Sequence, residues 1–147
     1  MTDVHTKEQR RRNMQAIKSG NTKPEIFIRK LLFKKGFRYR LKNKLEGKPD
    51  IVIKRFQTVI FVNGCFWHGH RCHLFKTPRS NTDFWKNKIK KNRKRDKTVK
   101  NILLKTSWRI LVIWECSLRG KKKIEERLLL SKITSFLKNS KLKHLSV

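Results

Sequence analysis

Acidic residues are scarce in this chain of 147 residues, which contains 10 Asp and Glu against 40 Lys and Arg. The formal net charge is therefore +30 at pH 7. So many positive charges repel one another in a compact protein, and they attract the protein to polyanions, above all to phosphate backbones. The composition predicts a nucleic-acid-binding protein.

Long apolar runs are also absent. No run approaches the about 20 residues that a membrane-spanning helix needs, so no membrane association is expected. Residues 1–12 are polar and basic, without the apolar core of a secretory signal, which predicts a cytoplasmic protein. Only three cysteines are present. In a reducing compartment, clustered Cys and His side chains bind metal more often than they form disulfides.

The order of helical and strand patterns predicts an α/β fold with a mixed central sheet flanked by helices. The expected helices cover residues 6–17, 22–36, 83–106 and 121–138, and the expected strands cover residues 37–41, 50–53, 58–62 and 108–114. No repeat or linker divides the chain. We expect one domain over residues 1–147, with a DNA-binding N-terminal arm over residues 1–20 and a core over residues 21–140.

Two local signals support this prediction. Thr22 and Glu25 match a capping box at the start of a helix that Gly36 ends. The strands 50–53 and 58–62 are close in sequence and predict a hairpin. The residues expected to face the core are Ile26, Phe27, Leu31 and Leu32 on the second helix, and Ile124, Leu128, Ile133, Phe136 and Leu137 on the last helix.

The densest group of reactive side chains is FVNGCFWHGHRC, residues 61–72, most of which lies in a long loop without clear periodicity. Long loops in compact domains are commonly functional or held by a metal. Zinc prefers four Cys and His ligands in a tetrahedron, and a structural site is closed by all four. Cys65, His70 and Cys72 are close enough in sequence to hold one ion.

Cys116 is the remaining cysteine, and it closely follows the strand pattern of residues 108–114. If this strand lies parallel to residues 58–62, the ends of the two strands meet and Cys116 joins the group. His68 and His73 compete as the fourth ligand. The alternative is that the cysteines are small buried apolar residues.

Asp50 begins a strand directly after Gly-Lys-Pro, which would hold its carboxylate at a sheet edge. Cleavage of a phosphodiester needs an activated water, a cation for the developing charge and a proton for the leaving group. Mg²⁺ takes few protein carboxylates and keeps several waters. Glu25 and Asp96 are the other isolated acids. Their structural alternatives are a helix cap for Glu25 and a salt bridge within the basic helix for Asp96.

Phe66 and Trp67 are adjacent in a loop bounded by Gly64 and Gly69, where burial of both rings would be awkward. Side chains that insert between base steps unstack them at a cost on the order of a few kcal/mol. This cost is smallest at a mispair, so insertion can act as a mismatch filter. The alternative is that Trp67 packs over the zinc loop.

These motifs closely resemble those of the very-short-patch repair (Vsr) DNA mismatch endonucleases. The similarity covers roughly residues 3–120 and runs through DVH, NMQAI, GKPDIVI, VIFVNGCFWHGHRC, LFKTPRSNTDFW, KNRKRD and ILVIWECSLRG. The family shares the restriction-endonuclease core but lacks the acid-x-Lys half of its motif. This chain agrees, since its second strand ends in Phe61, Val62 and Asn63.

The resemblance implies a role for each matching residue. Asp50 would be the direct carboxylate ligand of a catalytic Mg²⁺, and Val62 would contribute its backbone carbonyl. His68 would act in water activation, while Glu25 and Asp96 would hold outer-sphere waters or orient His68. The implied ligands of a structural zinc are Cys65, His70, Cys72 and Cys116.

The implied substrate is double-stranded DNA with a T:G mismatch, which arises by deamination of 5-methylcytosine. The implied reaction is a nick in one strand, 5′ to the mispaired thymine. Phe66, Trp67 and Trp85 would enter the duplex from the major groove, and the N-terminal helix, with Met14 as a wedge, would lie in the minor groove. Mismatch-repair proteins are candidate partners, and a monomer associated with the bacterial nucleoid is expected.

Four positions depart from the family pattern. Val62 stands where Thr is common, Asn63 stands where His is common, and Gly69 and Arg71 replace histidines. A backbone-carbonyl role survives at Val62, whereas Asn63 removes a second proton-transfer group. Two other functions stay open: a sequence-specific restriction endonuclease of the same fold, and a zinc-stabilised DNA-binding protein without catalysis. The first would need a symmetric dimer, for which no apolar face is left over.

Overall fold

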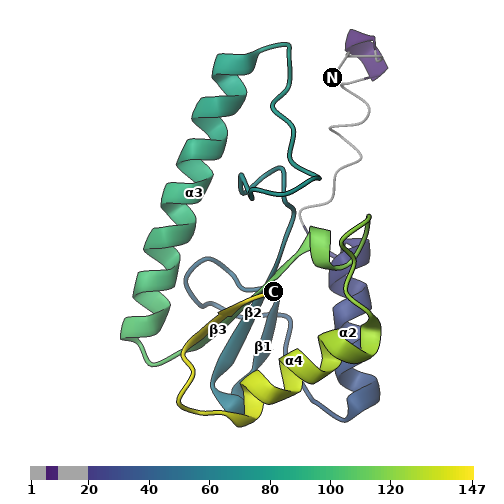
Figure 1. Ribbon diagram of the computed structural model, residues 1–147. Helices are drawn as coiled ribbons and strands as arrows, with labels where there is room; N and C mark the ends of the chain where they lie inside the picture. The colour runs from purple at the N-terminus through teal and green to yellow at the C-terminus, as the bar shows by residue number, and fades with distance from the viewer. Residues whose placement is uncertain (1–5, 10–19) are drawn as a thin grey trace.

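A four-stranded mixed sheet, in the order β1-β2-β3-β4, lies at the centre of the computed structural model, which describes residues 6–9 and 20–147 (Figure 1). β1 (Ile51–Ile53) and β2 (Thr58–Asn63) form the predicted antiparallel hairpin. β3 (Arg109–Trp114) lies parallel to β2, and β4 (His144–Ser146) lies parallel to β3. The predicted α/β fold with a mixed sheet is confirmed.

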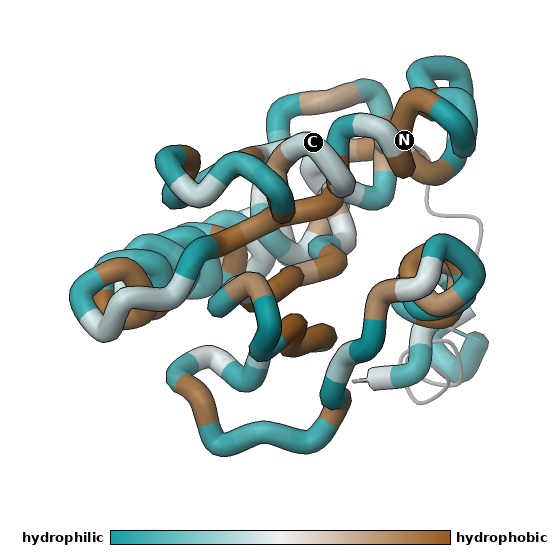
Figure 2. The backbone as a smooth tube through the Cα atoms, turned by 90° about the horizontal axis from the view of Figure 1, so that it is seen from below, coloured by the Kyte–Doolittle hydropathy of each residue, from teal (hydrophilic) through white to brown (hydrophobic). Residues whose placement is uncertain are grey.

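Helices cover both faces of the sheet. α2 (Lys23–Lys35) and α4 (Glu126–Lys138) pack on one face, and α3 (Thr82–Lys105) packs on the other (Figure 1). The strands are therefore apolar on both sides, and hydrophobic residues gather along them in Figure 2. The larger core includes Ile28, Leu32, Ile60, Leu111, Ile133 and Phe136, and the core beneath α3 includes Val52, Val59, Val99, Leu103 and Ile110.

The ends of α2 follow the predicted capping chemistry. The Thr22 hydroxyl accepts a hydrogen bond from the Glu25 N–H at 3.4 Å, and Gly36 ends the helix with a φ of 101°. The predicted apolar face is partly wrong, because Ile26 is 37% exposed whereas Ile28 is fully buried. Residues 28, 31 and 32 share one helix face, and that face meets the sheet.

The strand predicted over residues 37–41 does not form. Only Arg40 pairs with β1, through a single bridge to Val52. β1 is three residues long, and the chain bends at Leu41, whose carbonyl accepts a hydrogen bond from the Asn43 side chain at 3.2 Å. The local alternation of residue types was therefore a poor guide here.

The C-terminal region differs from the prediction in three ways. α4 begins at Glu126 instead of residue 121, after a loop that contains Gly120, where φ is 86°. Acidic residues in the first turn of a helix interact favourably with the positive end of the helix dipole, whereas lysines there do not. The helix therefore starts at Glu126 and not at the lysines of residues 121–123. Leu128 was predicted to be buried but is 52% exposed, while Leu129 is buried. β4 was not predicted, since it is a three-residue edge strand without β-branched residues.

The predicted helix over residues 6–17 is described only at its start. Residues 7–9 are helical, and Thr6 and Gln9 exchange two hydrogen bonds of 2.9 and 3.1 Å between side chain and backbone. This is a capping box. Met14 lies outside the described residues. Over the part of the chain that the structure describes, no helix has the length and apolar character to cross a membrane.

Candidate active site

A cleft of about 590 Å³ lies where α2, the start of β1, the end of β2 and α3 converge. The four residues predicted to take part in catalysis all line it: Glu25, Asp50, His68 and Asp96. Val62, Asn63 and Trp67 line it as well. The fold thus brings together residues that are separated by up to 71 positions in the sequence, from Glu25 to Asp96.

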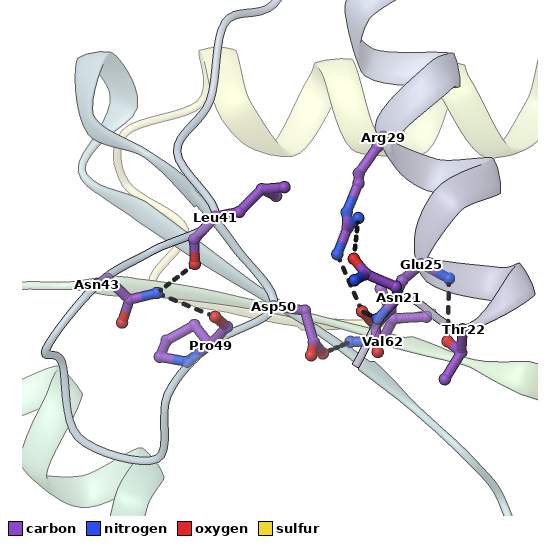
Figure 3. A network of polar contacts seen from close by, with 9 residues as sticks. All are labelled: Asn21, Thr22, Glu25, Arg29, Leu41, Asn43, Pro49, Asp50 and Val62. Carbon is purple, nitrogen blue, oxygen red and sulfur yellow. Dashed lines mark hydrogen bonds and ion pairs between the residues drawn. The ribbon is translucent and has the colours of Figure 1, made fainter. Parts of the chain in front are cut away.

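Asp50 is held at the end of the hairpin, as Figure 3 shows. The Val62 N–H donates to its Oδ2 at 2.7 Å. Burial raises the pKa of Asp50 to about 6; the Val62 N–H opposes this rise and the Glu25 carboxylate adds to it. The carboxylate therefore faces the cleft in an environment that disfavours its negative charge unless a cation is present.

Glu25 is 4% exposed and reaches the same cleft from the first turn of α2. Its Oε2 accepts hydrogen bonds from Arg29 at 3.1 Å and from the Asn21 N–H at 3.0 Å (Figure 3). The capping alternative for Glu25 is therefore correct in part: the Glu25 carboxylate binds the N–H of Asn21, one residue before the N-cap Thr22. Because Glu25 and Asp50 face one cleft, these residues fit Mg²⁺, which takes one or two carboxylates and keeps several waters.

His68 and Asp96 form a close pair across the cleft. The His68 Nδ1 and the Asp96 Oδ2 are 2.6 Å apart, and the two side chains are 26% and 41% exposed. An ionised Asp96 accepts a hydrogen bond, so the proton of a neutral imidazole lies on Nδ1 and Nε2 is the ring atom that can accept a proton. The long helix α3 positions Asp96, and the loop after β2 positions His68.

The four predicted zinc ligands meet at the ends of β2 and β3. The ligand atoms of Cys65, His70, Cys72 and Cys116 all lie within 4.8 Å of one another. The sulfurs of Cys65 and Cys116 are 3.6 and 3.5 Å from the His70 Nδ1. Ligands about 2.0–2.3 Å from a central ion would be spaced in this way. The cluster is consistent with a zinc site, and the predicted parallel pairing of the two strands is confirmed.

The two other histidines considered as zinc ligands have different surroundings. His68 pairs with Asp96. His73 packs against Gly120, where an added Cβ would come within 2.6 Å of the His73 Nε2. Among the residues that the structure describes, the only group of three or more His, Cys, Asp and Glu side chains whose ligand atoms lie close enough to share one metal ion is the Cys65, His70, Cys72 and Cys116 cluster.

Several residues that support this cluster were missed at the sequence level. The Trp114 ring stacks on His70 with centroids 4.0 Å apart and planes 5° apart. Glu115 accepts from the Cys65 N–H at 3.4 Å and from the Arg119 Nε at 2.8 Å. The adjacency of Glu115 to Cys116 was the one available signal. Burial raises the pKa of Cys65, so a metal would displace a proton from this thiol. Burial lowers the pKa of His70, which favours the neutral ring that binds metal.

The predicted DNA-wedge aromatics form a single cluster. The ring of Phe66 lies 5.3 Å from Trp67 and 5.4 Å from Trp85, and these two tryptophans are 5.7 Å apart, all edge to face. Phe66 and Trp67 are half-buried, so the expectation of two exposed rings is wrong. Mutual packing accounts for the burial. Phe84, which was not predicted, is 58% exposed and 5.2 Å from Trp85.

Trp67 connects this aromatic cluster with the cleft. It lines the cleft beside His68, and its carbonyl accepts a hydrogen bond from the Asn92 side chain at 2.9 Å. A cleft with two carboxylates, a His–Asp pair and an adjacent basic helix can support metal-assisted hydrolysis of a phosphodiester. The fold and the site therefore define a candidate nuclease.

Comparisons with known proteins identify the family. The family model described as DNA mismatch endonuclease Vsr matches residues 2–74. The chain is 48% identical over 129 residues to the type II nicking enzyme V.NmeAIP of Neisseria meningitidis serogroup A, covering 87% of this chain and 92% of the relative. It is 41% identical over 138 residues to the DNA mismatch endonuclease Vsr of Escherichia coli K12, covering 93% and 88%.

A third relative, the type II nicking enzyme V.XorIIP of Xanthomonas oryzae pv. oryzae, is 45% identical over 129 residues, covering 87% of this chain and 95% of the relative. The chain belongs to the Vsr DNA mismatch endonuclease family, as its motifs predicted, and it is an endonuclease of that family. The relatives' names divide between mismatch endonuclease and nicking enzyme at similar identity.

Proposed function

We propose that this protein is a Mg²⁺-dependent endonuclease that nicks one DNA strand 5′ to the thymine of a T:G mismatch. The nick would start very short patch repair of deaminated 5-methylcytosine. The observation that carries the proposal is that Asp50, the His68–Asp96 pair and Trp67 line one cleft. A group that inserts at a mismatch then lies next to the groups that cut the strand.

Asp50 is the proposed direct ligand of Mg²⁺, together with the backbone carbonyl of Val62. Glu25 would hold waters of the outer coordination sphere. When bound, Mg²⁺ would offset the negative charge that develops on the scissile phosphate. The raised pKa of Asp50, caused mainly by burial, supports this role, because a nearby cation would stabilise the ionised carboxylate.

His68 is the proposed general base. Its Nε2 would take a proton from the attacking water, while Asp96 holds the proton on Nδ1 and stabilises the imidazolium that forms. Asn63 also lines the cleft, but its amide cannot take up a proton at neutral pH. Proton transfer is therefore assigned to His68.

The zinc site has a structural role in this proposal. It would tie the ends of β2 and β3 to the loop that carries His68 and Trp67. A structural zinc contributes directly to folding, so the ion would fix the positions of the base and of the aromatic cluster. Cytoplasmic location, a monomeric state and contact with mismatch-repair proteins stay predictions.

A second candidate function is strand nicking without preference for a mismatch. The observation that favours it is the similarity to proteins named as type II nicking enzymes. The two functions share the cleft chemistry and differ only in the duplex that is cut.

A nicking assay under single-turnover conditions separates these functions. Two duplexes that differ only in a T:G or a T:A pair are compared, with Mg²⁺ or with EDTA. We expect nicking of the T:G duplex that requires Mg²⁺ and is lost in Asp50→Asn. Equal rates on the two duplexes would support the second candidate, and normal nicking by Asp50→Asn would remove Asp50 from the mechanism.

A further inference from the structure

A groove of about 740 Å³ runs between α3 and the loop that precedes β1. It is continuous with the catalytic cleft, since Gly47, Lys48, Arg95 and Val99 line both. Five of its lining residues are basic and one, Glu46, is acidic. The basic residues are Lys44 and Lys48 on the loop, and Lys91, Lys94 and Arg95 on α3.

The loop wall of the groove is held in shape by its own hydrogen bonds. The Asn43 amide donates to the carbonyls of Leu41 at 3.2 Å and Pro49 at 3.1 Å (Figure 3). The Leu45 N–H donates to the Asn43 Oδ1 at 3.1 Å, and the Lys48 N–H donates to the Leu45 carbonyl at 3.1 Å. Lys44 and Lys48 therefore extend from an ordered loop.

The loop is also pressed against α3. At Gly47, where φ is 75°, an added Cβ would lie 2.4 Å from the Val99 Cγ1. Only a glycine permits this approach without displacement of Val99. The close contact fixes the distance between the basic residues of the loop and those of α3, so both walls of the groove are positioned before a ligand arrives.

The groove leaves the cleft in a defined direction. Along α3, Trp85 and the aromatic cluster lie near the N-terminus, and the groove follows the helix from Lys91 to Val99, on either side of the position of Asp96. Figure 1 shows the loop between α2 and β1 beside the half of α3 that leads to β3. The aromatic cluster therefore meets α3 near its start, at Trp85, and the groove lies further along the helix, at residues 91–99.

We propose that the groove binds the phosphate backbone of the strand that is cut, on the side of the scissile phosphate away from the mismatch. This rests on the proposed function; for a nick 5′ to the thymine, these phosphates lie upstream of the nick. Lys48 and Arg95, at the junction with the cleft, contact the phosphate next to the scissile one. Lys44, Lys91 and Lys94 contact the phosphates beyond it. Such contacts position the strand without reading its sequence.

The first test is the salt dependence of DNA binding. Each phosphate contact contributes about 0.9 to the slope of log K against log salt concentration. In a groove variant with Lys44, Lys91 and Lys94 changed to Ala, the magnitude of this slope should be smaller than in the wild type by about 2–3. The matched control has the same loss of charge on the opposite face of the sheet, with Lys30, Lys34 and Lys132 changed to Ala. All six lysines are exposed, so both variants should fold.

In the control variant, the magnitude of the slope should differ from that of the wild type by less than about one. Equal slopes for the groove variant and the control would overturn the proposal. The slope is measured on T:A and T:G duplexes alike, so this result does not depend on mismatch preference.

The second test places a single neutral methylphosphonate at each position of the cut strand. In the wild type, substitutions within a few phosphates upstream of the nick should weaken binding, and in the groove variant these same substitutions should have no further effect. Unchanged effects in the variant, or effects confined to the downstream side, would contradict the assignment. If the wild type shows no preference for the T:G duplex but upstream methylphosphonates still weaken its binding, the result would count against the proposed function and not against the groove.

Discussion

The His68 Nδ1 lies 2.6 Å from the Asp96 Oδ2, which joins the loop after β2 to the middle of α3. This one contact orients the imidazole and determines which ring nitrogen can accept a proton. The same loop carries Trp67, which borders the cleft. Proton transfer and mismatch recognition are therefore proposed to depend on one short segment and on the helix behind it.

His68→Ala should slow the cleavage step by about 10²–10⁴-fold and leave DNA binding within a few-fold, because the phosphate contacts are kept. Asp96→Asn should also slow cleavage, and it should alter the pH dependence of the rate, since the amide no longer fixes the proton on Nδ1. Single-turnover rates from pH 5.5 to 8.5 measure both effects. An unchanged rate in His68→Ala would exclude this residue as the base.

Asp50→Asn should abolish nicking and stabilise the metal-free protein at neutral pH. The pKa of Asp50 is raised from 3.8 to about 6 mainly by burial, so the folded state holds a proton that the unfolded state has lost over this range. The free energy of unfolding of the wild type therefore falls as pH rises from about 4 to 6, by on the order of 2–3 kcal/mol. Above about pH 6 the free energy of unfolding of the wild type stays lower by this full amount, because Asp50 is ionised in both states.

Urea unfolding in EDTA-free, Mg²⁺-free buffer at pH 5 and pH 7.5 measures this effect as the difference between variant and wild type. The gain in stability of the variant over the wild type should be larger at pH 7.5 than at pH 5, where the wild type already carries only about half of the penalty. Asp83→Asn, which removes an exposed carboxylate on α3, is the matched control substitution. A stability difference between Asp50→Asn and wild type that is the same at both pH values would contradict the assigned burial of the charge.

The pH dependence of nicking should have an acidic limb near pH 6, where Asp50 takes up a proton in place of Mg²⁺. Because metal and proton compete for the carboxylate, a higher Mg²⁺ concentration should move this limb to lower pH. Rates measured at two Mg²⁺ concentrations across the pH range test the competition. A limb that does not respond to Mg²⁺ would have to come from a group other than Asp50.

Cys116→Ser should lose zinc and thermal stability together, because a structural zinc contributes to folding. A loss of about 3 kcal/mol would lower the melting temperature by roughly 10 °C in a chain of this size. Zinc content by atomic absorption and melting by circular dichroism are measured on the same samples. His73→Gln is the control and should retain one equivalent of zinc. Full zinc content in Cys116→Ser would show that the ligand set is different.

The zinc cluster and the cleft could be predicted because their residue types are rare in this chain. Cys65 and Cys116 each follow an apolar strand pattern, and parallel strands place such positions at one edge of the sheet. Asp50 was conspicuous because so few acids are present. Glu25 and Asp96 were candidates as the other isolated acids, and the resemblance to the Vsr family then implied catalytic roles for them and for His68, which spacing alone does not connect.

Other features depend on tertiary contacts that the sequence does not display. Ile26 and Ile28 are equally apolar, and only the position of α2 against the sheet decides that Ile28 is the buried one. Trp67 is half-buried because of Trp85, a partner 18 positions away. The basic groove likewise requires the contact between Gly47 and Val99, which no local pattern predicts.

Trp67→Ala should reduce the preference for T:G over T:A more than it reduces total affinity. Most of the affinity comes from charge and should fall steeply with salt in wild type and variant alike. Insertion of an aromatic side chain is easiest at a weak base pair, so its loss removes discrimination. Phe33→Ala, at an exposed ring on α2, is the control. An unchanged T:G preference in Trp67→Ala would move recognition to Phe66, Trp85 or the N-terminal segment.

The most direct test of the central claim is a map of the cut on a duplex with one T:G mismatch, both strands being end-labelled. With Mg²⁺, the account predicts a single product end immediately 5′ to the mispaired thymine, an intact partner strand, and little cutting of the matched T:A duplex. Cuts in both strands, or cutting of the T:A duplex at the same position and rate, would contradict it.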